Sequence, residues 1–121
     1  MDVQIGIDLV EVAEIEQSLA LHGDRFLDRV FTPAERARAR GNPRLLASGF
    51  AAKEATMKAL GRADEAVEWR SIEALGDRGD PQITLHGEAA RIADARSVTA
   101  LSATVSADRA RAIAIVVAEA T

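Results

Sequence analysis

The chain has 121 residues, a net charge of −4 and a hydrophobic fraction of 48%, of which very little is aromatic. This length suits one hydrophobic core, so we expect a single domain over residues 1–121. A pI near 5.2 argues against a nucleic-acid or membrane-surface partner. The absence of cysteine excludes disulfides and thiolate catalysis. No apolar run reaches the length of a membrane span and the first residues carry no basic signal region, so we expect a cytoplasmic protein.

The spacing of apolar residues and the positions of turn residues predict the elements in chain order. They are a strand at 3–9, helices at 11–21, 26–31, 33–41 and 43–60, strands at 67–75 and 82–86 joined by a turn at 76–81, a helix at 87–95, and strands at 98–105 and 112–118. Together they predict an α+β domain whose mainly antiparallel sheet of about four or five strands is flanked by helices. The last strand is apolar throughout 113–117, which is typical of a strand covered on both faces.

Two of the predicted helices have clear start signals. Thr32 precedes Pro33, and Glu35 follows three residues after the threonine, which is the pattern of a capping box. Asn42 and Pro43 repeat the combination of cap and proline at the start of the longest helix. The alternating arginines of the preceding helix, at 36, 38 and 40, are interpreted as a solvated helix face.

Asp8 is the first candidate for chemistry, because it is a carboxylate within an otherwise apolar strand. Burying a lone carboxylate is costly, so this side chain must be solvated, paired or bound to a cation. An equally good interpretation is that Asp8 only marks the end of the strand and caps the next helix.

The second candidate lies in the helix at 43–60. Glu54 and Lys58 are four residues apart and share a face, and Lys53 stands beside Glu54. The simplest interpretation is an exposed Glu–Lys pair. It is weakened by composition, because the only two lysines among 15 Lys and Arg residues both fall here. Lysine is a compact phosphate ligand, and Glu54 with Asp8 would offer two oxygen ligands to Mg²⁺. The combination suggests a metal-assisted site for a phosphate-containing substrate.

These features resemble the holo-[acyl-carrier-protein] synthase family of 4′-phosphopantetheinyl transferases. Residues 5–12 (IGIDLVEV) are similar to its N-terminal G-[IL]-D motif, and residues 50–61 (FAAKEATMKALG) to its second signature, [FW]-[AS]-x-K-E-A-x-x-K. FTPAE at 31–35 is similar to the family's F-T-x-x-E helix start, and residues 112–119 resemble its closing strand. The likeness covers essentially the whole chain.

The resemblance implies the 4′-phosphopantetheinyl transferase-like fold and a Mg²⁺-dependent transferase. Its reaction moves 4′-phosphopantetheine from coenzyme A to a serine of an apo acyl carrier protein of fatty acid or polyketide biosynthesis, and it releases 3′,5′-ADP. Asp8 and Glu54 match the metal ligands, and with Lys58 they are the expected catalytic residues. Lys58 matches the lysine near the diphosphate, and Lys53 the lysine beside it. Single-domain members resemble homotrimers with sites between subunits, so we expect a homotrimer.

The chain departs from the family pattern at the nucleotide end and at the carrier-protein face. The family usually has arginine where this chain has Glu14 and Gly49. Its C-terminal H-x-S-[IL]-[ST]-H pattern aligns with residues 102–107, so both of its histidines, at 102 and 107, are missing. We expect the remaining contacts with coenzyme A in this region to come from Arg44, Thr104 and Ser106.

Two functions therefore stand against each other. The retained carboxylates and lysines favour the transferase, whereas the missing basic groups favour a degenerate, non-catalytic relative that binds a carrier protein or a multienzyme. A third hypothesis is a different metal-assisted reaction of a phosphate ester on the same fold.

Overall fold

The computed structural model describes residues 1–62, 66–76 and 79–121. Within these residues, three strands form an antiparallel sheet in the order β1–β5–β4, and two more pair as a separate antiparallel hairpin, β2–β3. Their bounds are β1 Asp2–Glu11, β2 Ile72–Leu75, β3 Gln82–Leu85, β4 Val98–Ala107 and β5 Arg111–Ala120. The α+β class and the antiparallel pairing are confirmed, but the prediction of one sheet is wrong for the described strands, which form two.

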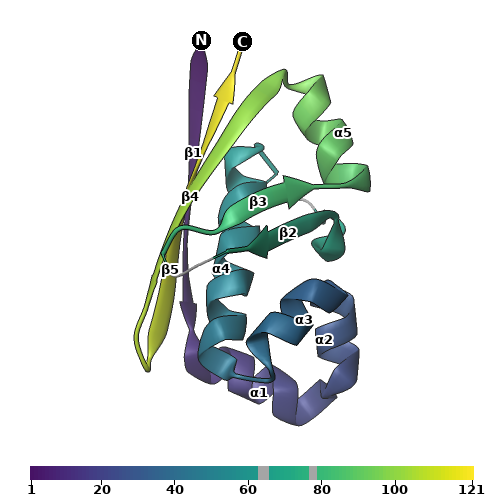
Figure 1. Cartoon of the computed structure of the whole chain (residues 1–121), viewed down its shortest axis with the longest axis vertical. Helices are drawn as coiled ribbons and strands as arrows, with labels where there is room; N and C mark the ends of the chain where they lie inside the picture. Colours follow the sequence, from purple (N-terminus) through teal and green to yellow (C-terminus); the bar gives the residue numbers. More distant parts are fainter. Residues whose placement is uncertain (63–65, 77–78) are drawn as a thin grey trace.

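Helices cover one face of the three-stranded sheet. Figure 1 shows α4 lying along that face, with the β2–β3 hairpin crossing α4 on its other side, α1 to α3 gathered at one end and α5 at the other. The helix bounds are α1 Val12–His22, α2 Asp24–Val30, α3 Pro33–Ala39, α4 Pro43–Ala59 and α5 Gly87–Ala95. Because the hairpin packs over α4, its strands cannot continue the sheet that α4 covers. No described helix has both the length and the apolar character needed to cross a membrane.

The predicted helix starts are confirmed. Thr32 Oγ1 accepts a hydrogen bond from Glu35 N at 3.2 Å, and Glu35 Oε1 accepts one from Thr32 N at 2.8 Å, which is the expected capping box. The side chain of Asn42 accepts hydrogen bonds from the backbone N–H groups of Arg44 and Leu45 at the start of α4.

The prediction of a strand over 67–75 is wrong in its first half. The strand β2 begins at Ile72, after a short 3₁₀ helix at Trp69–Ser71. The Glu68 side chain accepts a hydrogen bond from Arg70 N at 3.2 Å, and Ser71 Oγ donates to the backbone oxygen of Glu68 at 2.6 Å. Such local side-chain bonds compete with strand pairing, and they fold this segment into a turn. Residues 77 and 78 of the predicted turn at 76–81 lie outside the described residues.

The contact between β1 and α4 is unusually close. A Cβ atom placed on Gly6 would lie only 1.9 Å from Ala55 O and 2.7 Å from Ala59 N, so only glycine fits at this point of the strand. The neighbouring positions of the interface are also small or β-branched and buried: Ala51, Ala55, Ala59, Ala112, Ala114, Val116 and Ala118. The alanine-rich composition therefore allows the helix backbone to approach the sheet closely.

The opposite face of the sheet is apolar and exposed within one chain. Successive side chains of a strand point to opposite faces, so the residues between the buried ones share this outer surface. They retain between 37% and 59% of their accessible surface: Val3, Ile5, Ile7, Leu9, Ile113 and Ile115. The sequence predicts that the last strand is covered on both faces, but within one chain β5 is covered on only one face.

The close contact at Gly6 gives a stability prediction. We expect Gly6→Ala to lower the free energy of unfolding by about 2 kcal/mol or more, because backbone atoms of α4 must move to make room. Urea denaturation at one fixed protein concentration measures the change. The matched control is Gly49→Ala in α4, where the new Cβ would lie 3.5 Å from Phe31 Cε1. We expect the control to be neutral or stabilising by up to about 1 kcal/mol, and equal losses in both variants would contradict the argument.

Candidate functional site

Asp8 and Lys58 meet where β1 crosses α4. Asp8 lies two residues after Gly6 and therefore shares its face of the strand, toward the helix. Lys58 Nζ lies 2.9 Å from Asp8 Oδ1 and also donates a hydrogen bond to Ile7 O at 3.0 Å. The Asp8 side chain keeps 13% of its accessible surface and that of Lys58 keeps 37%. The ion pair is therefore reachable from solvent on the lysine side.

Glu54 completes this cluster one helical turn before Lys58. It is half-buried, and burial raises the pKa of its carboxyl group above the usual range. The negative charge of Asp8 raises this pKa further, whereas Lys58 lowers it. Asp8 and Glu54 are thus close enough to repel each other. The structure brings together the three residues expected to be catalytic, although 46 positions separate the carboxylates along the chain.

The donor set of this cluster fits a hard divalent cation. Two carboxylates supply oxygen ligands, and their mutual repulsion is the kind that a bound cation relieves. Among the described residues there is no group of three or more His, Cys, Asp or Glu side chains that would form a closed metal cage. A pair of carboxylates suits Mg²⁺, which keeps several waters and commonly binds substrate phosphates as well.

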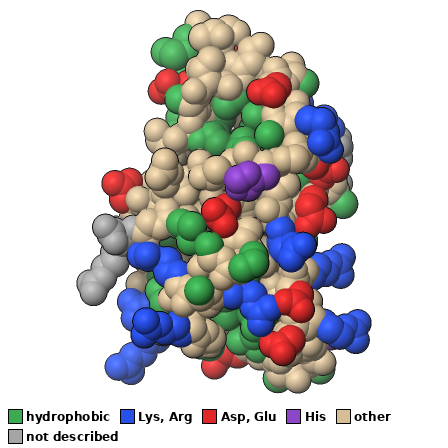
Figure 2. Space-filling view, turned by 45° about the vertical axis from the view of Figure 1, so that its right-hand side comes forward, with side chains coloured by type: hydrophobic (Ala, Val, Ile, Leu, Met, Phe, Trp, Pro, Cys, Tyr) green, Lys and Arg blue, Asp and Glu red, His purple; other side chains and the backbone are tan. Residues whose placement is uncertain are grey.

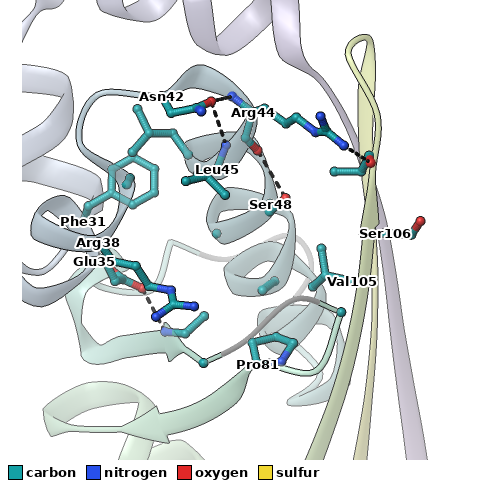
Figure 3. Close-up of a pocket in the computed structure, with 18 residues that line it drawn as sticks. Phe31, Glu35, Arg38, Asn42, Arg44, Leu45, Ser48, Pro81, Val105 and Ser106 are labelled. Atoms are coloured by element: carbon teal, nitrogen blue, oxygen red, sulfur yellow. Dashed lines mark hydrogen bonds between the residues drawn. The ribbon is translucent and has the colours of Figure 1, made fainter.

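A cavity of about 640 Å³ lies on the other side of α4 (Figure 3). Its walls come from α3, the start of α4, the end of β2, the segment before β3, and β4. Asp8, Glu54 and Lys58 do not line it. Ala52 does, and Glu54 follows it by two positions, roughly 200° around the helix. One chain therefore presents the cavity and the carboxylate cluster on opposite faces of the same helix.

Two arginines make this cavity electropositive. Arg44 lines it and donates a hydrogen bond from Nη2 to Ala107 O at 2.9 Å, so its guanidinium is held across the mouth (Figure 3). Arg38 points into it from α3. Among the described lining residues the one carboxylate is Glu35, whose charge is compensated by Lys53 at 2.8 Å. The sequence suggested Arg44 as a contact with coenzyme A and Arg38 as part of a solvated helix face, and the structure places both arginines at this cavity.

Lys53 lies apart from Asp8 and Glu54. Its side chain has no exposed surface, and its Nζ is 2.8 Å from Glu35 Oε1. One position along a helix is a rotation of about 100°, which turns Lys53 toward the hairpin while Glu54 faces β1. Burial lowers the pKa of Lys53, and the contact with Glu35 partly offsets this effect. Lys53 belongs to the same sequence motif as Glu54 and Lys58, but in the structure its ammonium group lies away from both of them.

The side chains of Thr104 and Ser106 face away from the cavity that Arg44 lines. Both are exposed, and as alternate residues of β4 they share the outer face of the sheet. Ser106 stands at the rim of the cavity, but its side chain points to the far side of the strand (Figure 3). Within one chain these hydroxyls face outward with the apolar surface of β1 and β5.

Comparison with known proteins identifies the family. The profile of the 4′-phosphopantetheinyl transferase superfamily matches residues 4–116. The holo-[acyl-carrier-protein] synthase of Solidesulfovibrio magneticus is 45% identical over 118 residues, covering 95% of this chain and 96% of the relative. That of Alkalilimnicola ehrlichii is 42% identical over 125 residues, covering 98% of each chain. The Helicobacter pylori synthase in complex with coenzyme A matches with a TM-score of 0.83 and 32% identity, over 95% of this chain and 99% of that one.

The chain therefore belongs to the 4′-phosphopantetheinyl transferase superfamily, and the resemblance seen in its motifs is confirmed.

The raised pKa of Glu54 predicts how the stability of the metal-free protein depends on pH. The folded state holds the Glu54 proton more tightly than the unfolded chain does. The contribution of this residue to the free energy of unfolding therefore falls as pH rises through its folded-state pKa. Glu54→Gln removes that dependence. We expect the variant to be more stable than wild type at pH 7 by about 0.5 kcal/mol, a small value because the group is partly solvated, and to show no advantage at pH 4. Urea denaturation with a chelator present measures both values, and a less stable variant at pH 7 would contradict the assignment.

Proposed function

We propose that this protein transfers 4′-phosphopantetheine from coenzyme A to a serine hydroxyl of an apo acyl carrier protein. The observation that carries the proposal is the cluster of Asp8, Glu54 and Lys58, which combines two carboxylates and one ammonium beside solvent. Membership of the superfamily supports it, and so do the many relatives named holo-[acyl-carrier-protein] synthase.

In this proposal Asp8 and Glu54 hold Mg²⁺. The bound ion would neutralise negative charge on the diphosphate of coenzyme A. Lys58 adds a fixed positive charge at the same place, and its bond to Ile7 O keeps it oriented toward the cluster. Asp8 therefore has two partners of opposite charge, the ion and the lysine, which suits its largely buried position.

The chemical step forms one bond and breaks another. The serine oxygen attacks the phosphorus that carries pantetheine, the bond from that phosphorus to 3′,5′-ADP breaks, and the serine proton passes to a base. In this proposal the base is one of the two carboxylates of the cluster. Lys58 offsets the charge that develops on the departing 3′,5′-ADP.

The cavity suits the nucleotide end of coenzyme A. Its volume of about 640 Å³ lies within the range of small-molecule sites. Arg38 and Arg44 provide guanidinium groups that match phosphate geometry. Figure 2 shows that Lys and Arg side chains gather in the lower half of the view, at the end of the molecule where α2 and α3 lie and α4 begins. The arginines of these elements are Arg25, Arg29, Arg36, Arg38, Arg40 and Arg44. An arginine at this cavity can replace the one that the family usually has at position 49.

A homotrimer would join the two halves of the site. The carboxylate cluster lies at the β1 edge of the sheet and the cavity at the β4 edge, so one chain does not present both to a single substrate. The exposed apolar face, with Ile5, Ile7 and Ile115, offers a surface that a second and third copy would bury. Thr104 and Ser106 share this face and would then border a neighbouring protomer.

The proposed activity predicts a mass change that depends on the carboxylates. Incubation with coenzyme A, Mg²⁺ and several apo carrier proteins should add one phosphopantetheine to a carrier, detected by mass spectrometry. We expect Asp8→Ala and Glu54→Gln each to lower kcat/KM by about a hundredfold or more, with circular dichroism unchanged, because two ligands hold the ion. Near-normal turnover in either variant would remove the metal assignment. Binding of a carrier protein by wild type without any transfer would instead identify a non-catalytic relative.

The proposed trimer predicts a coupling between assembly and activity. Ile7→Glu places a charge in the centre of the exposed apolar face, so we expect this variant to sediment as a monomer and to lose transfer activity. Sedimentation velocity at micromolar concentration measures the state of both proteins. Leu21→Glu, at an exposed site of α1, is the matched control and should keep the assembly of wild type. A wild-type monomer that is fully active would refute the proposed assembly.

A further inference from the structure

Lys53 is a buried cation that the proposed reaction does not use. All three hydrogens of its ammonium group have acceptors: Nζ lies 2.8 Å from Glu35 Oε1 and 3.1 Å from Trp69 O, and it also donates to Ile72 O. The aromatic ring of Phe31 lies beside it, with the ring centroid 5.9 Å from Nζ. No donor is left for a phosphate, and no part of the side chain reaches solvent.

Both carboxylate oxygens of Glu35 also have partners. Its Oε1 accepts a hydrogen bond from Thr32 N at 2.8 Å, and its Oε2 accepts one from Ala74 N at 2.8 Å. Its side chain keeps 5% of its accessible surface. The residue therefore closes the capping box of α3, bonds to the middle of β2 and compensates Lys53 at the same time. Through this pair, three segments that are distant in sequence are fixed to one another: the start of α3, the middle of α4 and the strand β2.

The segments fixed by this pair are walls of the cavity. Phe31 and Glu35 line it from the start of α3, Ala52 from α4, and Ala74 from β2. Arg38 stands one helical turn after Glu35, so its direction into the cavity depends on how α3 is held. A second hydrogen bond, which Thr32 Oγ1 donates to Glu73 Oε2 at 2.6 Å, also joins the start of α3 to β2.

We propose that Lys53 and Glu35 are positioning residues that set the width of the coenzyme A cavity, and that Lys53 does not touch the substrate. The identity of the ligand rests on the proposed function, whereas the role of the pair rests on its own contacts. Apolar residues often replace a buried ion pair without loss of stability, so stability alone gives little reason to bury these charges. Hydrogen bonds depend more strongly on length and direction than apolar contacts do. The bonds of this pair therefore define the separation between α3 and β2.

The test separates positioning from phosphate binding. In the full chain we expect Lys53→Met to raise KM for coenzyme A by about tenfold or more while kcat at saturation changes less than about threefold, because a distorted cavity binds more weakly but leaves the reacting groups in place. Lys58→Met makes the same chemical change at the other lysine, and it should lower kcat strongly. A large loss of kcat in Lys53→Met, or an unchanged KM, would overturn the proposal.

A second measurement does not depend on activity or on the ligand. Trp69 is the only tryptophan of the chain, its oxygen accepts a hydrogen bond from Lys53, and its ring stacks on Phe50 at 4.8 Å. We expect its fluorescence emission to shift in Lys53→Met and to stay as in wild type in Lys58→Met. A folded Lys53→Met protein with wild-type emission refutes the positioning role even if coenzyme A is not the ligand. Failure of wild type to bind coenzyme A, with the emission shift present, refutes the proposed function alone.

Loss of folding in the single variant has its own control. Lys53→Met leaves the carboxylate of Glu35 buried without its cation, which is costly. Adding Glu35→Gln removes the unpaired charge, so we expect the double variant to recover much of the lost stability in urea while keeping the raised KM and the shifted emission. A double variant with the KM and emission of wild type would overturn the proposal.

Discussion

The contact between Gly6 and the backbone of α4 is the constraint on which the site depends. Asp8 lies two residues further along the same face of β1, so the distance between strand and helix decides whether it meets Lys58 and Glu54. A larger residue at position 6 would push the helix away from the strand. The alanines that fill the rest of this interface serve the same geometry, and they explain why a chain with so few aromatic residues still closes its core.

The helix α4 carries charge on several sides at once. Toward β1 it presents Glu54 and Lys58, toward the hairpin it buries Lys53, and its first turn holds Arg44 across a cavity. The three cations have partners from different elements: Lys58 pairs with β1, Lys53 with α3 and Arg44 with the backbone of β4. A single rigid helix therefore fixes the relative positions of the carboxylate cluster and of the cavity, which lie on opposite faces.

Local signals in the sequence predicted most of the secondary structure, and residue chemistry predicted the cluster. The caps at Thr32 and Asn42 depend only on adjacent residues, so they are readable from the sequence. A carboxylate in an apolar strand must be solvated, paired or bound to a cation, so Asp8 could be grouped with Glu54 as a metal ligand, but its ion pair with Lys58 was not predicted. The environment of Lys53 was not predictable, since its partners Glu35 and Ile72 come from distant segments. The same holds for Arg38, whose direction depends on tertiary packing.

Neighbouring positions of α4 thus meet unlike surroundings, with Lys53 sealed among carbonyl and carboxylate oxygens and Glu54 facing β1. One residue inserted or deleted just before Lys53 would rotate the rest of the helix by about 100° and move each following side chain into its neighbour's surroundings. A deletion would turn the Glu54 carboxylate toward the sealed space, and an insertion would turn the Lys53 ammonium toward β1. Changes of length are therefore excluded from this stretch during evolution, whereas the loop before Asn42, where a new helix begins with its own cap, can absorb them.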